Sequence, residues 1–500
     1  AETIRTTLGP KGMDKMLVDS MNDVIVTNDG VTILNEMNIE HPAAKMIVEI
    51  AKTQESEVGD GTTTAVVIAG ELMKKAEQLL DLEIHPTVIA KGYRLAAEKA
   101  LQILNNMSET VTDNDDDVLK NIAMTAMTGK GVESAKDKIS DICLHAITQV
   151  TTEKTDKDNI KIEKKVGEGI EDSELIKGIV IDKERTHSEM PKKLENANVA
   201  LIDIPLEIKD TEIDAKIQIS DPAQLQSFLD KEESILKEMT DRINDSGAKV
   251  VICQKGIDDM AQYFLAKKGI FALRRVKESD MRKIAKATSG KIVSNLKELS
   301  KEDLGFAGLV EERKISNEKM TFITKCENPK AVTILVRGGT EHVVDEVERA
   351  ITDALGDITA ALNDGKIVAG AGSPEMEVSK QLKEYAHTLS GREQLAVLAF
   401  AEALEIIPKT LAENAGLDPI DMLTEMKVKH DNNEKWAGID VYNGKIVNSW
   451  DAKVLEPLKV KTQAIKSASE VAELILRIDD IIAASTNGQE IPQGGMPPMM

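Results

Sequence analysis

The chain has 500 residues, too many for a single hydrophobic core, so its length predicts several domains. Its 86 acidic residues outnumber 63 basic ones, and the formal net charge of −23 argues against a general binder of nucleic acid or of anionic membranes. Only three cysteines occur, far apart in sequence, and no apolar run approaches the roughly 20 residues of a membrane span, so buried thiols in a reducing cytoplasm are favoured over a disulfide framework or a membrane protein.

The N-terminal residues contain two short glycine turns. Residues 1–7 have the pattern of a helix that ends at a Gly-Pro pair, without an initiating methionine, and we expect that a further N-terminal piece precedes them. The turns are Leu8-Gly9-Pro10-Lys11-Gly12-Met13 and Thr27-Asn28-Asp29-Gly30. Glycine lets the backbone approach an anion closely, but such turns are common. Without further information, Asp29 is best interpreted as a turn residue that bonds its own backbone.

A block of helices spans residues 43 to about 105, where apolar residues recur at helical spacing. A third glycine turn, Gly59-Asp60-Gly61-Thr62-Thr63-Thr64, precedes one of these helices. Threonine hydroxyls and the free N–H groups of a helix start, with their partial positive charge, favour phosphate. Asp60 would repel phosphate unless a divalent cation lay between them, so the turn predicts a magnesium-nucleotide site with Asp60 as the metal ligand.

The pattern changes after a polar boundary at residues 112–117. Residues 118–150 predict two more helices, on either side of the turn Thr128-Gly129-Lys130-Gly131. Short apolar strands then alternate with helices over residues 185–335, which is typical of an α/β or α+β domain.

The C-terminal third begins with a strand at residues 332–336, which leads into a long helix through Ile351. Residues 375–482 then return to a helical pattern. A helical block therefore opens and closes the chain, and an α/β module is inserted between its halves.

An amphipathic helix is expected inside the α/β region. Asp221 suits a helix N-cap and Pro222 the first helical position. Apolar side chains follow at helical spacing, namely Leu225, Phe228, Leu229, Ile235, Leu236, Met239 and Ile243. The pattern alone predicts that this stripe is buried in the core of its domain.

The order of the three glycine turns is more specific than any one of them, and it resembles the nucleotide site of the chaperonins. No P-loop motif is present. Further matches are Thr128-Gly129-Lys130-Gly131, Asp353-Ala354-Leu355, Gly370-Ala371-Gly372 and Glu456-Pro457. The resemblance runs along nearly the whole chain and is strongest to the group II chaperonins, the archaeal thermosome and its eukaryotic cytosolic relatives.

The resemblance implies a multidomain α and α/β fold. An all-α equatorial ATP-binding domain would comprise residues 1–113 and 371–500, and a small α/β intermediate hinge domain residues 114–184 and 336–370. Residues 185–335 would form an inserted α/β apical domain for substrate binding, whose helical protrusion at about 206–237 acts as a built-in lid. Residues 487–500, rich in Gly, Pro and Met, are expected to be a disordered tail.

The resemblance also assigns roles to single residues. Asp353 would position the water that attacks the γ-phosphate, and because it lies in the hinge segment, hydrolysis would wait for hinge closure. Asp29 and Lys130 complete the expected catalytic set, Lys130 as a sensor of the γ-phosphate, and Asp60 is the expected metal ligand. The expected nucleotide-binding residues are Leu8, Gly9, Pro10, Asn28, Gly30, Gly61, Thr62, Thr63, Thr64, Gly372 and Glu456.

One position departs from the family pattern. The Gly-Gly-Gly turn that contacts the nucleotide near its base and ribose has alanine at its centre here, Ala371. Alanine tolerates a positive φ poorly, so either this residue has ordinary dihedral angles or the contact is altered.

The implied function is an ATP-dependent chaperone, an ATPase that encapsulates and folds nonnative proteins in a double ring of identical or homologous subunits. ATP and Mg²⁺ are the expected cofactors, with K⁺ as a further candidate. We expect a cytoplasmic protein with no nucleic-acid, membrane or separate co-chaperonin partner. The competing hypotheses are a small-molecule kinase or ATPase with the same magnesium-nucleotide chemistry, and a nucleotide-regulated scaffold. A kinase would need a second acid-base constellation, and no coherent His or Cys set accompanies the glycine turns.

Overall fold

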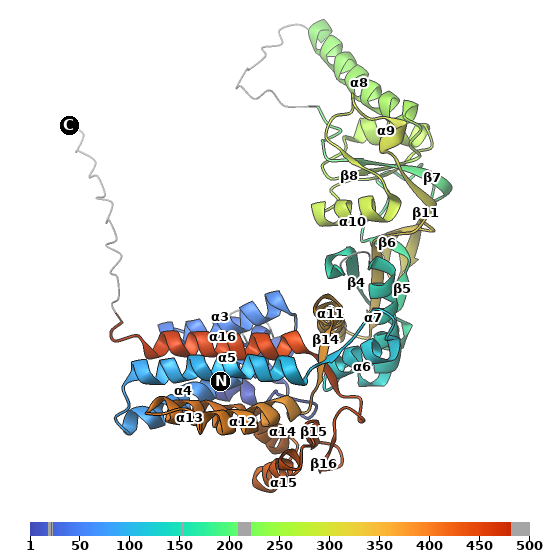
Figure 1. The fold of residues 1–500 in the computed structure, drawn as a ribbon. Helices are drawn as coiled ribbons and strands as arrows, with labels where there is room; N and C mark the ends of the chain where they lie inside the picture. The colour runs from blue at the N-terminus through green and yellow to red at the C-terminus, as the bar shows by residue number, and fades with distance from the viewer. Residues whose placement is uncertain (19–21, 23, 152–154, 209–221, 482–500) are drawn as a thin grey trace, which may run out of the picture.

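The computed structural model describes residues 1–18, 22, 24–151, 155–208 and 222–481. The chain forms an elongated body with a helical base, a small middle segment and a larger upper segment (Figure 1). The first and last parts of the chain share the base, while the central part forms the other two. The expected multidomain α and α/β fold is confirmed.

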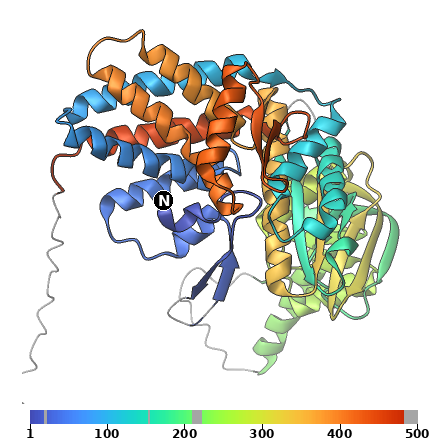
Figure 2. The same cartoon turned by 90° about the horizontal axis from the view of Figure 1, so that it is seen from below.

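The base consists mainly of long helices that pack side by side (Figures 1 and 2). Its N-terminal elements are α1 (Glu2–Arg5), β1 (Lys15–Val18), β2 (Val24–Thr27), α2 (Gly30–Glu36), α3 (Pro42–Glu57), α4 (Thr62–Asp81), α5 (Pro86–Met107) and β3 (Glu109–Thr110). Its C-terminal elements are β14 (Lys366–Ala369), α12 (Ser373–Ala386), α13 (Glu393–Leu404), α14 (Ile406–Asn414), α15 (Pro419–Asp431), β15 (Ala437–Asp440), β16 (Lys445–Asn448), β17 (Leu455–Pro457) and α16 (Leu458–Leu476).

The core of the base lies between α4, α5, α12, α13 and α16. Alanines dominate the facing positions, which lets the helix backbones approach closely, and aromatic residues make up only 2% of the sequence. Tyr93 and Phe400 meet edge to face at 5.6 Å in this core. The Tyr93 hydroxyl donates to the carbonyl oxygen of Leu72 at 2.8 Å, so its one polar atom is satisfied.

The middle segment is built around a three-stranded sheet of order β4-β13-β5. Its elements are α6 (Asp116–Met127), η1 (Glu133–Ala135), α7 (Lys136–Val150), η2 (Lys157–Asn159), β4 (Ile160–Val166), η3 (Ile170–Asp172), β5 (Glu174–Ile176), β13 (Val332–Gly338) and α11 (Glu341–Asp364). Strand β13 runs parallel to β4 and antiparallel to β5. Helix α11 follows β13 directly and packs against α6, α7 and the base, so it links the segments.

The upper segment holds a seven-stranded sheet of order β6-β12-β11-β7-β8-β9, with β10 paired to β7. Its elements are β6 (Gly178–Ile181), β7 (Lys193–Ile202), α8 (Pro222–Asp245), β8 (Val250–Cys253), α9 (Asp259–Lys267), β9 (Phe271–Leu273), α10 (Glu278–Thr288), β10 (Ile292–Val293), η4 (Lys301–Asp303), β11 (Gly305–Ile315) and β12 (Glu318–Thr324). Alternate residues of β7 enter separate cores on the two faces, Val199 and Leu201 on one, Ala200 and Ile202 on the other.

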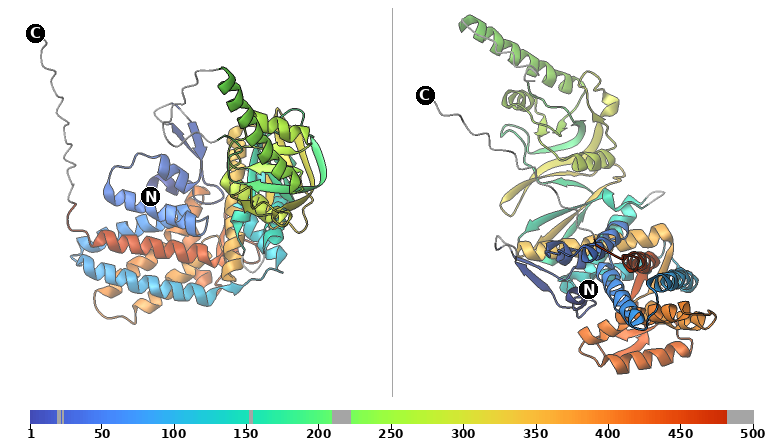
Figure 3. Two further views of the ribbon diagram at one scale, coloured as in Figure 1. Left: turned by 90° about the horizontal axis from the view of Figure 1, so that it is seen from above. Right: turned by 90° about the vertical axis from the view of Figure 1, so that its left-hand side faces the viewer.

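The expected lid lies partly outside the described residues. Residues 209–221, including the expected cap Asp221, and the expected tail 487–500 are not described. Helix α8 begins at Pro222 and extends away from the sheet (Figure 3). In its second half Leu236 and Ile243 are buried, as the stripe predicted, whereas Ile235 is 38% exposed. The side chains of Leu225, Phe228 and Leu229 lie outside the described set.

Several short strands in the base were not anticipated. Strands β1 and β2 form a hairpin that projects from the helices (Figure 2), β15 and β16 form a second hairpin, and β14 pairs with β17 and β3. Strands of two to four residues leave no measurable periodicity between long helices, which explains why the sequence pattern missed them. Among the described residues, no helix combines the length and apolarity required to cross a bilayer.

Candidate functional site

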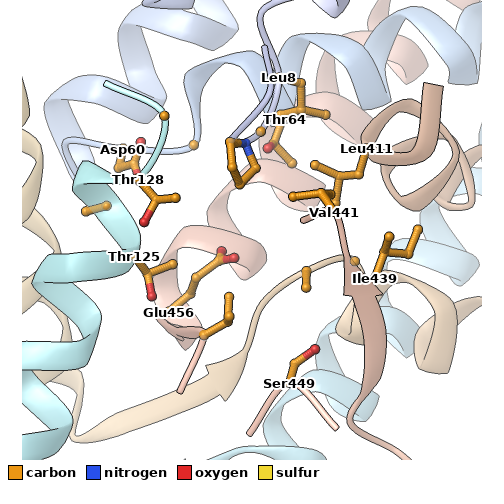
Figure 4. Close-up of a pocket in the computed structure, with 18 of the residues that line it drawn as sticks. Leu8, Asp60, Thr64, Thr125, Thr128, Leu411, Ile439, Val441, Ser449 and Glu456 are labelled. Carbon is orange, nitrogen blue, oxygen red and sulfur yellow. The ribbon is translucent and has the colours of Figure 1, made fainter. Parts of the chain in front are cut away.

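A cavity of about 600 Å³ lies where the base meets the middle segment. Its walls come from the turns before α2 and α4, the α6–η1 turn, α11, the β14–α12 turn, the β15–β16 hairpin and the segment before α16. In Figure 4 the labelled side chains, which come from the N-terminal turn, the start of α4, the end of α6, α14, the β15–β16 region and the segment before α16, surround one hollow. The volume is in the range of pockets that hold nucleotide-sized ligands.

The turn before α4 brings backbone close to the cavity. Gly59 and Gly61 have φ values of +100° and +78°, which favour glycine. The Gln54 side chain is fully buried on α3. Its Nε2 donates to the carbonyl oxygens of Asp60 at 2.9 Å and of Val460 at 3.2 Å. Gln54 thereby fixes the turn against the start of α16.

The start of α4 places donors beside a free carboxylate. Thr62, Thr63 and Thr64 line the cavity, and the first N–H groups of a helix have no partner within it. Within the described ranges, the Asp60 carboxylate makes no hydrogen bond or ion pair with the protein. In the same ranges, no group of three or more His, Cys, Asp or Glu is arranged to hold a metal ion. Mg²⁺ therefore fits this donor set with phosphate and water oxygens as its other ligands, which is its common mode of binding.

The N-terminal turn and the α6–η1 turn pack together at one side of the cavity. A Cβ at Gly129 would lie 2.8 Å from Pro10 Cα, and Asn28 Nδ2 donates to the Gly129 carbonyl at 3.0 Å. Gly9 has φ +85°, and a Cβ there would lie 2.3 Å from Leu411 Cδ2. These contacts require glycine and connect the base to the middle segment.

Asp29 caps helix α2. Its Oδ2 accepts from the N–H and the hydroxyl of Thr32 at 2.8 and 2.7 Å, and its Oδ1 accepts from the Thr62 hydroxyl at 3.4 Å. Asp29 therefore does bond to its own turn, as the sequence suggested, and its Oδ1 also contacts the start of α4. Gly30 does not line the cavity. A Cβ at Gly30 would lie 2.7 Å from Thr63 Oγ1, so this glycine allows α2 to approach α4.

Lys130 and Asp353 form an ion pair inside the cavity, between Nζ and Oδ2. Burial raises the pKa of Asp353 to about 7, the nearby carboxylate of Asp60 adds to the rise, and the Lys130 ammonium opposes it. Burial alone would lower the pKa of Lys130, but the charges of Asp353 and Asp60 hold that pKa above its usual value. The pair thus brings an ammonium and a titratable carboxyl together from two elements of the middle segment.

One helical turn beyond Asp353 lies a second buried carboxyl, Asp357, which is 2% exposed and whose Oδ1 has no hydrogen-bond partner in the described structure. Burial and the charges of Asp60 and Glu456 raise its pKa well above the usual value. The preceding residue, Gly356, packs closely against the turn before α4. A Cβ there would lie 2.8 Å from the carbonyl oxygen of Val58. The backbones of helix α11 and of this turn are therefore in direct contact, with no side chain between them.

The opposite end of the cavity is mostly apolar. The lining residues there are Ile407, Leu411, Ile439, Val441, Val447, Ser449 and Val454, some of which are labelled in Figure 4. Ala371 and Gly372, from the β14–α12 turn, complete this wall. The cavity therefore has one end rich in donors and charge and one end suited to an apolar, planar group.

Ala371 adopts φ +57°, so the first of the two alternatives considered for this departure, ordinary dihedral angles, is wrong. Its carbonyl accepts from the N–H of Ile439 at 3.1 Å, and its methyl packs against Gly438, which holds the turn in this conformation. A non-glycine residue in the left-handed region is strained by about 1 kcal/mol.

We expect Ala371→Gly to raise the free energy of unfolding by about 0.5–1 kcal/mol, because glycine adopts this φ without strain but loses more entropy on folding. Urea unfolding measures the change. Ala415→Gly is the control, because Ala415 ends α14 at φ −78° and its replacement is expected to destabilise. Equal destabilisation by both substitutions would show that Ala371 is not strained.

A buried ion cluster borders the cavity, because two of its members, Glu456 and Lys461, belong to the cavity lining. Lys461, on α16, contacts Glu375 Oε1 at 3.0 Å and Glu456 Oε2 at 2.7 Å, and its side chain is 7% exposed. Burial raises the pKa of Glu456, although the Lys461 ammonium opposes that rise. Burial alone would lower the pKa of Lys461, but the two carboxylates hold it above its usual value. The cluster fixes α12, β17 and α16 together behind the site.

The cavity brings together almost every residue that the sequence singled out. Only Gly30 lies outside its lining, and the residues that line it are Leu8, Gly9, Pro10, Asn28, Asp29, Asp60, Gly61, Thr62, Thr63, Thr64, Lys130, Asp353, Gly372 and Glu456. Their chemical roles stay predictions. Sequence reasoning missed Gln54, Asp357, Glu375, Lys461 and Ser449.

Comparisons with known proteins point to one family. The model of the TCP-1/cpn60 chaperonin family matches residues 1–486. The thermosome subunit of Methanopyrus kandleri is 62% identical over 97% of this chain and 90% of its own length, and the thermosome subunit beta of Methanothermobacter thermautotrophicus is 60% identical over 100% and 94%. Among solved structures, an open-state monomer of a group II chaperonin from Methanococcoides burtonii superposes with a TM-score of 0.63 at 48% identity, over 84% of this chain and 100% of that one.

Proposed function

The chain belongs to the TCP-1/cpn60 chaperonin family, and from this premise we propose that the cavity between its base and middle segment is the site of ATP hydrolysis. The protein is an ATP-dependent chaperonin that hydrolyses ATP and folds other proteins. It assembles into an oligomeric ring and binds unfolded substrates. The family match favours this function over the small-molecule kinase and the scaffold considered above.

The main support for this site is that the Asp60 turn and the Lys130–Asp353 pair line the same cavity. The triphosphate would lie at the α4 helix start, where N–H groups and threonine hydroxyls stabilise its charge. Mg²⁺ beside Asp60 would neutralise the repulsion between the carboxylate and the phosphates. The base and ribose would occupy the apolar end, next to Gly372 and Glu456.

Asp353 is the residue that would hold and orient the attacking water. In the structure its carboxylate is paired with Lys130. A γ-phosphate would compete for the Lys130 ammonium, so nucleotide entry would release the Asp353 carboxylate to accept a hydrogen bond from water. Because Asp353 comes from α11 and the turns come from the base, a change in the angle between these parts would start or stop hydrolysis.

The same proposal extends to the larger segments, in keeping with the resemblance to the group II chaperonins. Residues 1–113 and 371–500 would form the equatorial domain, 114–184 and 336–370 the hinge, and 185–335 the apical domain, with a lid at about 206–237 in place of a separate co-chaperonin. We further propose a double ring of identical or homologous subunits, a cytoplasmic location, and K⁺ as a second cation. The three cysteines are unpaired, which is consistent with a reducing compartment.

Asp60→Asn tests the metal assignment. The substitution removes a negative charge next to the phosphates, so we expect the Mg²⁺ concentration for half-maximal ATP hydrolysis to rise by about tenfold or more. Phosphate release measured across a Mg²⁺ titration gives this value. Asp81→Asn, at the exposed far end of helix α4, which the Asp60 turn precedes, is the matched control. An unchanged Mg²⁺ requirement in Asp60→Asn would remove Asp60 as the metal ligand.

A further inference from the structure

The apolar end of the cavity contains one hydroxyl that the protein does not use. Ser449 follows strand β16 and is 1% exposed. Its Oγ has no hydrogen-bond partner in the described structure. Buried polar atoms in folded proteins are nearly always paired, so an unpaired hydroxyl in the wall of a ligand cavity calls for an explanation.

The backbone around Ser449 is fixed. Its N–H donates to the carbonyl oxygen of Trp436 at 2.8 Å, and its own carbonyl accepts from the N–H of Val454 at 3.0 Å. On one side the hydroxyl abuts Gly438, where a Cβ would lie only 2.1 Å from Oγ. The hydroxyl is therefore held at a defined place in the wall without a protein partner to set its direction.

The neighbours of Ser449 in this wall are apolar. Ala371, Ile439, Val447 and Val454 line the same end of the cavity and offer no side-chain donor or acceptor. The cavity lining also includes the polar residues Asp440, Tyr442, Asn443 and Lys453, but the Asp440 carboxylate already accepts from the N–H groups of Tyr442 and Asn443 and from the Asn443 side chain. A ligand that filled this end would bury its faces against hydrocarbon and could bring a polar edge to the unpaired Ser449 hydroxyl. A purine base has that form, with apolar faces and a polar rim.

We propose that Ser449 is a specificity-determining residue that hydrogen-bonds a polar atom on the edge of the purine base. The inference rests on the proposed function, because the base reaches this wall only if the triphosphate lies at the α4 end of the cavity. This hydrogen bond gives a partner to the Ser449 hydroxyl, which has none within the described protein. Because the partner belongs to the ligand, the hydrogen bond exists only in the nucleotide-bound state.

Ser449→Ala tests the proposal in the full-length assembled protein. We expect ATP affinity to fall about five- to tenfold, the loss of one hydrogen bond. The loss should vanish for the one analogue that lacks the contacted atom, among 1-deaza-, 3-deaza- and 7-deaza-ATP and purine riboside triphosphate. Fluorescence of the two tryptophans reports binding, because Trp436 and Trp450 stack at 5.6 Å directly beside Ser449.

Two further measurements separate this role from a structural one. The unfolding temperature of nucleotide-free Ser449→Ala should not fall, because no internal hydrogen bond is lost. Ser469→Ala is the matched control, since Ser469 is equally buried but its Oγ already donates to the Lys466 carbonyl at 2.9 Å, away from the cavity. Its nucleotide affinity should equal that of the wild type.

The outcomes distinguish this inference from the proposed function. Unchanged ATP affinity in Ser449→Ala, or an equal loss for ATP and all four analogues, would overturn the hydrogen bond to the base. Failure of the wild-type protein to bind ATP in this cavity would instead overturn the proposed site.

Discussion

Asp353→Asn is expected to reduce ATP turnover by about 10²- to 10³-fold while ATP affinity changes by less than about threefold. The carboxylate faces the donor-rich end of the cavity and is paired only with Lys130. An amide of the same shape cannot accept a proton or hold water with the same charge, so the loss falls on the chemical step. Single-turnover hydrolysis and equilibrium binding measure the two quantities separately. Asp345→Asn is the control, because Asp345 lies on the same helix but pairs with Lys164 at 2.8 Å, away from the cavity.

The pH dependence provides a second readout of the same residue. Burial raises the pKa of Asp353 to about 7, so the ionised fraction grows as the pH rises through 7. We expect kcat/KM of the wild type, which reports groups of the free enzyme, to rise between pH 6 and 8 with that pKa. The residual kcat/KM of Asp353→Asn should not show this rise between pH 6 and 8. Normal turnover in Asp353→Asn, or an unchanged pH profile, would contradict the catalytic assignment.

Lys461→Met is expected to destabilise the base by about 3–5 kcal/mol. The substitution keeps an unbranched side chain that is one atom shorter, and it leaves two buried carboxylates, Glu375 and Glu456, without their cation. Urea unfolding followed by tryptophan fluorescence measures the change locally, because Trp436 and Trp450 both lie in the base. Lys459→Met is the control on the same helix, where the partly exposed pair with Glu57 is separated by 3.6 Å and is worth about 1 kcal/mol or less.

The loss of unfolding free energy caused by Lys461→Met should become smaller as the pH falls from 7 toward 5. Burial already raises the pKa of Glu456, and removing the Lys461 ammonium that opposes this rise would raise the pKa further, so the folded state binds more protons than the unfolded state. The penalty is therefore largest at high pH and is lost at low pH. Adding Glu375→Gln to Lys461→Met should recover part of the stability at pH 7. Equal effects of Lys461→Met and Lys459→Met would show that the cluster is not structurally important.

The donor-rich end of the site could be predicted because its chemistry is local in sequence. In the Asp60 turn, glycines, threonines and the following apolar run are contiguous, and each has a physical reason to be there. Asp353 has no such local signal, since it is one of 86 acidic residues, and only the resemblance to a family identified it. The same holds for Lys130.

The supporting residues were missed because they come together only in the folded chain. Glu375 and Lys461 meet across 86 positions of sequence, which no spacing rule covers. A signal did exist for some of them. Lys461 shares the buried face of α16 with Ala464 and Ile465, and Asp357 lies on the buried face of α11, so each is a charge on an apolar stripe. Ser449 offers no comparable signal, because serine is common in turns.

The close contact between Gly356 and the carbonyl oxygen of Val58 joins helix α11 directly to the turn before α4, with no side chain between the two backbones. From Gly356 the helix runs back to Glu341, about 22 Å at 1.5 Å per residue, and there joins strand β13 of the middle sheet. A rotation of the helix about this contact would displace its far end more than the contact itself. If nucleotide binds in the cavity as proposed, a small shift of the turn before α4 would therefore be passed along this helix to the middle sheet.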